Sequence, residues 1–364
     1  MSTVPPPARS LPARDIIGTM PAENRAKRFA PGVAAFLLDY ALYFALLVGV
    51  VLLPWWLKVV CLFAAAGQIG RLFVLAHDAG HNALTPSYFW NRLLGRLAFL
   101  PSFTPYTSWQ HAHNHLHHGF LRIRGKDMVW CPWTLEQYRA ASPLRRFWYR
   151  FQRTTVGMPF YWIIENWVKS HFFPSKAVMK TRRGTLAAER LVIVAFVVLL
   201  TAGLWLVAER FGPGRESPLS GWQIPVMCVL VPYFLWCFVI ATVDLIHHTH
   251  PQAVWFKDAS TWNYFQANVE STTRIWLPLG LHKLFHNILE HAAHHVDPRI
   301  PLYHLPDSQR KLQGAFPGAV PEEMLLIRYV WRIFRTCQLY DYDKQQWLDF
   351  SGKPTSEAAA GQVG

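Results

Sequence analysis

Histidines gathered at three points of the chain could bind metal ions. The sequence contains 17 histidines, and eight of them form three short clusters. The clusters are HxxxH (His77, His81), HxxxHH (His113, His117, His118) and HxxHH (His291, His294, His295). Neutral imidazoles without thiolates suit borderline metals such as iron, zinc or copper. A single metal ion could not use so many ligands, so the clusters predict a site for two.

The second cluster leaves the choice of ligands open, because five histidines stand within eight residues. On an α-helix, His113 and His117 share a face and His118 lies about 100° from His117, so one turn can offer ligands to two adjacent metals. His111 and His115 share a neighbouring face. A histidine-rich tract with loose metal affinity is the alternative, and the patterned aromatic sequence around the cluster argues against it.

Four apolar stretches are long enough, at about 18 to 25 residues, to cross a membrane as helices, and the histidine clusters lie outside them. The chain is 52% hydrophobic and 16% charged, too apolar for an ordinary soluble protein. The stretches cover residues 34–53, 57–76, 191–208 and 224–246. Short connections join the first two and the last two, which predicts two helical hairpins. Asp39 and Asp244 lie in or at the ends of these stretches and are expected to face protein or water rather than lipid.

Basic residues predict the orientation of the spans, because Lys and Arg favour the cytosolic side. The net charge is +14, and five basic residues precede residue 34, sixteen lie in 77–190 and eleven follow residue 246. The connection between the last two spans contains only Arg210 and Arg215. Both termini and all three clusters are therefore expected in the cytosol. A nucleic-acid surface is the alternative use of such charge, and the four spans argue against it.

We therefore expect an all-α integral membrane protein, with four transmembrane helices in two hairpins and a cytosolic helical cap that carries the histidine clusters. Residues 34–350 are expected to form one membrane domain between flexible tails at 1–33 and 351–364. Three shorter apolar stretches, at 93–103, 156–168 and 277–289, predict helices that lie in the membrane interface or pack on the bundle. The five cysteines form no CxxC pair, which excludes a disulfide scaffold or a thiolate zinc site.

The ordered clusters resemble the histidine boxes of the membrane fatty-acid desaturases and their hydroxylase relatives. The resemblance extends over residues 57–305 and includes GKDMVWCP at 125–132, HTHP at 248–251 and HVDPRIP at 295–301. The Phe-His-Asn step at 285–287 is most similar to the omega-6 (delta-12) acyl desaturases. The chain departs from that type at the second box, which is commonly HxxHH there and has one extra residue here.

The resemblance implies a di-iron centre held by the eight box histidines and by one histidine outside the boxes. His286 is the first candidate for this ninth ligand, since it lies five residues before His291. Weaker candidates are His248, His250 and His282. Four acidic residues beside the boxes could orient imidazoles as hydrogen-bond acceptors, or could be solvated surface charges: Asp78, Asp127, Glu290 and Asp297.

The implied activity is an O2-dependent desaturation that introduces a double bond into a fatty acyl chain linked to a lipid, a carrier protein or CoA. The cofactors are two iron ions, with O2 as co-substrate and membrane lipids around the protein. No HPGG haem-binding motif occurs, so electrons are expected from a separate protein such as ferredoxin or cytochrome b5. A hydroxylase, epoxygenase, acetylenase or carotenoid-modifying oxygenase on the same scaffold is the close alternative. A non-catalytic membrane metal or haem protein is less favoured, because its ligands should lie within the spans.

Overall fold

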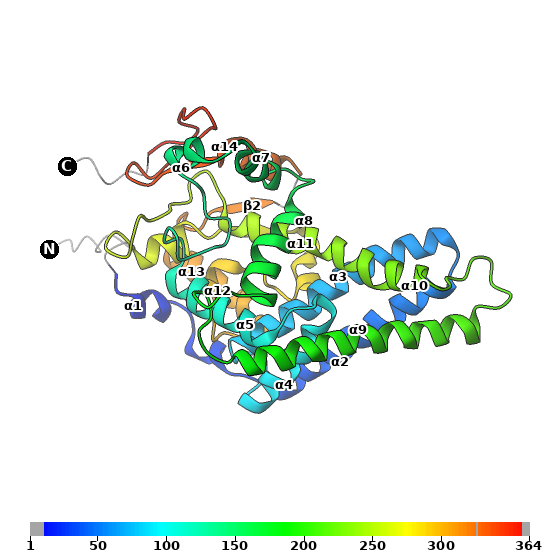
Figure 1. Ribbon diagram of the computed structural model, residues 1–364. Helices are drawn as coiled ribbons and strands as arrows, with labels where there is room; N and C mark the ends of the chain where they lie inside the picture. The colour runs from blue at the N-terminus through cyan, green and yellow to red at the C-terminus, as the bar shows by residue number, and fades with distance from the viewer. Residues whose placement is uncertain (1–10, 325–326, 359–364) are drawn as a thin grey trace. The chain divides into compact units, whose positions relative to one another are not determined.

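The computed structural model describes residues 11–324 and 327–358, and the chain is mostly helical (Figure 1). Within these residues, four helical runs are long and apolar enough to cross a membrane. They are α2 (Phe29–Leu52), α3 (Trp55–Gly80), α9 (Arg183–Phe211) and the run Gln223–His248. The last run consists of α10 (Gln223–Pro225), a π-helical segment (Val226–Leu230) and α11 (Val231–His248). The four spans predicted from the apolar stretches are confirmed.

The chain divides into two compact units, and each is described by itself. The membrane unit comprises Lys27–Ala112 and Pro159–Ala241 and contains most of the four long helices. The histidine unit comprises the described residues of 11–26, 113–158 and 242–358 and contains the second and third histidine boxes. The boundary between the two falls inside α11, so the last two turns of the fourth long helix belong to the histidine unit.

In the membrane unit, polar side chains inside the long helices are satisfied by protein groups. Asp39 of α2 is fully buried and forms an ion pair of 2.8 Å with Arg71 of α3, so it faces protein as expected. Lys58 donates to the carbonyls of Val50 and Val51 at 2.8 and 2.9 Å, which satisfies groups left open where α2 ends. By contrast, α9 exposes large apolar side chains such as Leu199, which suits contact with lipid.

Shorter elements of the membrane unit surround the long helices. They are α4 (Tyr88–Ala98), a 3-10 turn (Leu100–Ser102), α5 (Tyr106–His111), α8 (Met158–Tyr161) and a π-helical segment (Trp162–Phe172). The π-helical segment packs on α5, where the Ser108 hydroxyl donates to the His171 carbonyl at 2.6 Å. Glu189 of α9 accepts from the Thr107 amide and hydroxyl at 2.9 and 2.7 Å and from Arg96 of α4 at 2.9 Å. One buried carboxylate therefore fixes α4 and the start of α5, the helix that leads into the second box.

We expect Glu189→Ala to lower the free energy of unfolding by about 2 kcal/mol, because three donors lose a shared buried acceptor. Thermal unfolding of the purified protein in detergent measures this change. Glu209→Ala is the matched control, because Glu209 lies on the same helix, is exposed and accepts a hydrogen bond from Trp205 at 3.1 Å. Equal losses from the two variants would show that Glu189 has no such role.

The histidine unit combines short helices with two small sheets. Its helices are α1 (Ala13–Gly18), α6 (Leu135–Ala140), α7 (Pro143–Gln152), α12 (His291–Val296), α13 (Leu305–Ala315) and α14 (Ile327–Thr336). Strand β1 (Arg274–Trp276) pairs in parallel with β2 (Glu322–Met324). Strand β3 (Leu339–Asp341) pairs in antiparallel register with β4 (Gln346–Leu348). Between them lie 3-10 turns at Ala22–Arg25, His118–Phe120, Pro278–Phe285 and Leu302–His304, and π-helical segments at Ala112–His117 and Gln266–Glu270.

The shorter apolar stretches only partly form the regular helices that were predicted. The stretch 93–103 contains the second half of α4 and a 3-10 turn, and 156–168 contains α8 and the start of a π-helical segment. The stretch 277–289 contains 3-10 turns rather than one helix. Leu279 and Gly280 adopt left-handed backbone conformations there, with φ of 58° and 73°, which interrupts helical propagation.

The predicted tails lie partly outside the described residues, since residues 1–10 and 359–364 are not described. In the described part of the first tail, Arg25 forms an ion pair of 2.6 Å with Asp297. In the described part of the second, the Thr355 amide donates to the Trp347 carbonyl at 2.9 Å. The five cysteines are free thiols and four are buried, as expected of small apolar side chains.

Candidate metal centre

The first box lies where α3 ends. His77 belongs to the last turn of α3, and His81 is the residue that follows Gly80 at the helix terminus. Their ring centroids are 4.9 Å apart, so the i, i+4 pair does share one side of the helix as predicted. The Trp109 ring lies 5.4 Å from the His77 ring, and a Cβ atom at Gly80 would come within 2.5 Å of it. The glycine of the HDAGH motif therefore lets Trp109 pack against the two imidazoles.

The second box is not α-helical. After α5, the chain forms the π-helical segment Ala112–His117 and then a 3-10 turn. In a π-helix, hydrogen bonds run from i to i+5, so residues five apart become neighbours. The Nε2 atoms of His113 and His118 are accordingly 3.1 Å apart. The cluster does divide its imidazoles between two groups. The rings of His113 and His117 lie 5.3 Å apart, but His113 groups with His118 and His117 belongs to the other group.

The first group in the histidine unit contains His113, His118 and His294. One ring nitrogen from each lies within 4.8 Å of the others. The Nε2 atoms of His118 and His294 are 3.3 Å apart, and their ring centroids 5.0 Å. Two residues from the second box and one from the third thus point their nitrogens at a common position.

The second group contains His117, His248 and His295, whose ring nitrogens also lie within 4.8 Å of one another. All three side chains are buried. His291 adjoins this group, because its Nε2 atom is 3.0 Å from that of His248 and 3.1 Å from that of His295. The rings of His118 and His295 stack at 4.4 Å, so the two groups are direct neighbours.

The third box contributes histidines to both groups, and the helix that carries it, α12, is completely buried. Ala292 and Ala293, the small residues between its histidines, have no exposed surface, so the helix lies within the core. The Ala293 amide donates to Gln309 at 2.8 Å, and Tyr264 donates to the Val296 carbonyl at 2.7 Å. These bonds satisfy the ends of a helix that has only six residues.

The protonation of these imidazoles suits metal binding. Burial, followed by the nearby rings of His118, His291, His248 and His117, lowers the pKa of His295 well below its usual value. His295 is therefore neutral near pH 7, and the neutral imidazole is the form that ligates a metal. Neighbouring Nε2 atoms in these groups lie only 3.0 to 3.3 Å apart. At such distances two facing nitrogens cannot both carry a proton, so some of them must present lone pairs. This nitrogen-only donor set fits iron, zinc or copper.

Asp127 orients one box histidine, as predicted. Its Oδ1 atom accepts from His117 Nδ1 at 3.0 Å and from the Val129 amide at 3.1 Å. Its Oδ2 atom accepts from the Arg122 amide at 2.8 Å. A carboxylate at Nδ1 keeps the proton there and leaves the Nε2 lone pair available to a metal.

Two other acidic residues beside the boxes pair with arginines instead. Glu290 accepts from Arg274 at 2.5 and 3.1 Å. Asp297 accepts from Arg299 at 2.7 Å, in addition to its bond with Arg25. These two carboxylates are therefore neither imidazole acceptors nor solvated charges. The fourth, Asp78, is buried in the membrane unit beside the first box.

The candidates for the ninth ligand separate clearly. Among the described residues, His286 belongs to neither group; it is half-buried and left-handed, with φ of 49°. His250 lies 3.2 Å from Glu323, and His282 lies in the turns Pro278–Phe285. His248, which was a weaker candidate, is buried within the second group. The sequence signal for His248 is its position. His248 lies at the end of the fourth long helix, just as His77 lies in the last turn of the second.

His111 and His115, which left the second box ambiguous, are also accounted for. His111 Nε2 lies 2.8 Å from the Val178 carbonyl in the membrane unit, and His115 is exposed. Within the described chain, neither belongs to either group.

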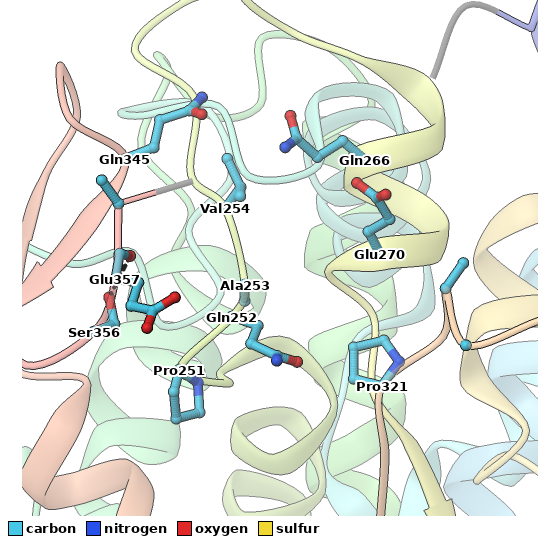
Figure 2. A pocket seen from close by; sticks show the side chains of 13 residues that line it. Pro251, Gln252, Ala253, Val254, Gln266, Glu270, Pro321, Gln345, Ser356 and Glu357 are labelled. Atoms are coloured by element: carbon cyan, nitrogen blue, oxygen red, sulfur yellow. Dashed lines mark hydrogen bonds between the residues drawn. The ribbon is translucent and has the colours of Figure 1, made fainter. Parts of the chain in front are cut away.

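A separate cavity of about 590 Å³ opens in the histidine unit (Figure 2). The residues that line it include no histidine, and amide and carboxylate side chains form much of its wall: Gln252, Gln266, Gln345, Glu270 and Glu357. The other lining residues include apolar ones such as Val254 and Pro321, and no residue of the histidine boxes lines the cavity. The cavity is therefore separate from the candidate metal centre.

Comparison with known proteins agrees with this geometry. The sequence model of the family described as "Fatty acid desaturase" matches residues 53–324. The chain is 27% identical over 339 residues to the sn-1 oleoyl-lipid 12-desaturase of Synechocystis sp., and the alignment covers 92% of this chain and 91% of that protein. It is 26% identical over 341 residues to the chloroplastic omega-6 fatty acid desaturase of Arabidopsis thaliana, with coverages of 91% and 70%. The family predicted from the histidine boxes is thus confirmed, and this chain belongs to the fatty acid desaturase family of membrane oxidoreductases.

Proposed function

We propose that the protein is an O2-dependent di-iron desaturase that introduces a cis double bond at the delta-12 (omega-6) position of a lipid-linked acyl chain. The observation that carries this proposal is the convergence of buried and half-buried histidine nitrogens from the second and third boxes and from His248. The position and the lipid-linked substrate rest on the relatives, which are described as oleoyl-lipid 12-desaturases and omega-6 desaturases.

The proposed ligands fall into two sets. His113, His118 and His294 would hold one iron, and His117, His248, His291 and His295 would surround the other. His77 and His81 are assigned to the same centre from their sequence motif alone. Two iron ions supply what amino-acid side chains cannot, an oxidant derived from O2 that takes hydrogen from an unactivated C–H bond.

The chain's own residues prepare this site. Burial of His117, His248, His291, His294 and His295 limits the access of water, and the lowered pKa of His295 keeps that ligand neutral. Asp127 holds the Nδ1 proton of His117. The enclosed alanines of α12 add no buried polar side chain of their own beside His291, His294 and His295.

The topology and the redox partner are also part of the proposal. The distribution of basic residues supports two helical hairpins, with the boxes and both termini on the cytosolic side. Electrons would come from a separate protein, such as ferredoxin or cytochrome b5.

Expression in a host that makes monounsaturated but no polyunsaturated lipids tests the proposed reaction. We expect gas chromatography and double-bond mapping to show a new diene derived from oleoyl lipid. Hydroxylated, acetylenic or carotenoid products without a diene would contradict desaturation and support the alternatives. A diene with its new bond elsewhere would contradict only the delta-12 assignment.

A matched pair of histidine variants separates the site from general effects in the same assay. We expect His118→Ala to abolish the diene, because His118 contacts both His113 and His294. His115→Ala should leave the diene unchanged, because His115 is exposed and outside both groups of the described residues. Equal activity of the two variants at equal protein levels would contradict the proposed ligand set.

A further inference from the structure

Two short helices of the histidine unit repeat one pattern that the desaturase reaction does not use. Helix α7 has the sequence PLRRFWYRFQ and α14 has IRYVWRIFRT. Each places apolar residues at i, i+3, i+4 and i+7, the spacing of one helix face. We call these faces the apolar stripes: Leu144, Phe147, Trp148 and Phe151 on α7, and Ile327, Val330, Trp331 and Phe334 on α14. Each helix also contains three arginines and no acidic residue.

The apolar stripe of α7 points away from the protein. Leu144 and Phe147 are 76% and 63% exposed, whereas Tyr149 and Gln152 on the other side are buried. Tyr149 packs with Leu339 of β3 and Leu348 of β4. The inner side of α7 therefore holds the helix on the β3–β4 sheet and leaves Leu144 and Phe147 of its apolar stripe exposed, while Trp148 and Phe151 are half-buried.

The apolar stripe of α14 does the same. Ile327 and Trp331 are 91% and 57% exposed, whereas Tyr329 and Ile333 are buried. The Tyr329 hydroxyl donates to the carbonyls of Ile246 and Thr249 at 3.1 and 3.2 Å. Helix α7 is bonded to the segment that follows α14, because the Tyr149 hydroxyl donates to the carbonyl of Gln338, two residues beyond α14, at 2.8 Å. Figure 1 labels both helices at the same edge of this unit.

Arginines border both apolar stripes. Within the described residues, no carboxylate pairs with Arg145, Arg146 or Arg328. Arg335 lies 4.4 Å over the Trp331 ring, and Arg145 lies 5.9 Å from the Trp133 ring. A guanidinium beside exposed aromatic rings can bind a phosphate group while the rings enter an apolar phase.

We propose that α7 and α14 form a surface anchor that binds anionic membrane lipid, with the apolar stripes in the headgroup–acyl boundary and the arginines on lipid phosphates. The fourth long helix continues into the histidine unit at Thr242–His248, so this unit is covalently tethered to a helix apolar enough to span a membrane. An acidic redox protein could match the arginines. It would not account for the exposed apolar side chains of both helices, Leu144, Phe147, Ile327 and Trp331, whereas a bilayer boundary covers all four.

The proposal is independent of the desaturase reaction, and its test reads lipid contact rather than product. Leu144→Cys and Ile327→Cys, each in a Cys131→Ser background, carry an environment-sensitive NBD fluorophore; the four other cysteines are buried. The full-length protein is placed in nanodiscs of phosphatidylcholine alone or mixed with phosphatidylglycerol. We expect NBD emission to move to shorter wavelength and become about two-fold brighter with phosphatidylglycerol at both positions, since charge attraction adds to apolar insertion.

Charge-matched variants identify the cause. Arg145→Gln, Arg146→Gln and Arg328→Gln together should remove the response to phosphatidylglycerol. Lys311→Gln, Lys344→Gln and Lys353→Gln, which remove equal charge from exposed positions elsewhere in the same unit, should not. Emission that is the same in both lipids would overturn the proposal, as would equal effects of the two triple variants. A response that requires an added acidic redox protein rather than anionic lipid would overturn it in favour of a docking site for that protein.

Discussion

Replacing His248 by alanine is expected to remove bound iron and to lower desaturation activity by more than about 100-fold. Losses of up to about 100-fold are typical when a residue that only hydrogen-bonds a metal ligand is replaced, so a ligand itself should cost more. The reason is the position of its ring, since His248 Nε2 lies 3.0 Å from His291 Nε2 and belongs to one group with His117 and His295. His286→Ala should keep both iron and activity. His286 is half-buried and lies outside both groups of the described residues.

Iron analysis of the two purified variants, with product analysis of the same preparations, measures this difference. The pair controls itself, because each variant removes one imidazole from the histidine unit. If His286→Ala lost iron and His248→Ala retained it, the ninth ligand would be the residue first expected from the sequence. If neither lost iron, neither His248 nor His286 would serve as a ligand.

His286 and His248 show where the sequence stops predicting this site. Proximity along the chain favoured His286, which lies five residues before His291. The backbone is left-handed at His286, and the chain turns there rather than continuing a helix. His248 is 43 residues from His291, and only tertiary folding brings the two rings to 3.0 Å. The three boxes could be found from local spacing, whereas a ligand supplied by a distant helix end could not be ranked.

The second box shows a different limit. The assumption of 3.6 residues per turn placed His113 and His117 on one face, whereas the π-helical segment Ala112–His117 groups His113 with His118. One residue inserted into an α-helix is commonly accommodated as a π-helical bulge. The extra residue that distinguishes HxxxHH from HxxHH was therefore the available signal. It predicts a local change of helix type rather than a shifted ligand.

The membrane helices were predictable for a physical reason. A span must be apolar over its whole length, so the property is local and survives without knowledge of packing. The hydrogen-bond partners of the carboxylates beside the histidine boxes were harder to predict, because they depend on tertiary contacts. Asp127, Glu290 and Asp297 are all near box histidines in sequence, yet only Asp127 bonds an imidazole. The other two meet arginines, one of which, Arg25, lies 272 residues away.

Asp127→Asn is expected to weaken iron binding by about 10- to 100-fold and to lower activity in parallel. An amide has one acceptor oxygen and one donor group, whereas Asp127 accepts from donors on both oxygens. If the amide oxygen faces His117 Nδ1, the amide NH2 meets the Arg122 N–H. If the oxygen faces Arg122, the NH2 meets His117 Nδ1 and drives its proton to Nε2, the atom needed for the metal.

Both orientations cost stability, but only the second removes a ligand, and a matched variant distinguishes these effects. Asp297→Asn changes another buried carboxylate of the same unit, whose partners are Arg25 and Arg299. We expect thermal unfolding to show a loss of about 1 to 3 kcal/mol in each variant. Competition with a chelator should show weaker iron binding only in Asp127→Asn. Equal weakening in both would mean that Asp127 acts through general stability, and the orientation of His117 would then be unimportant for the metal.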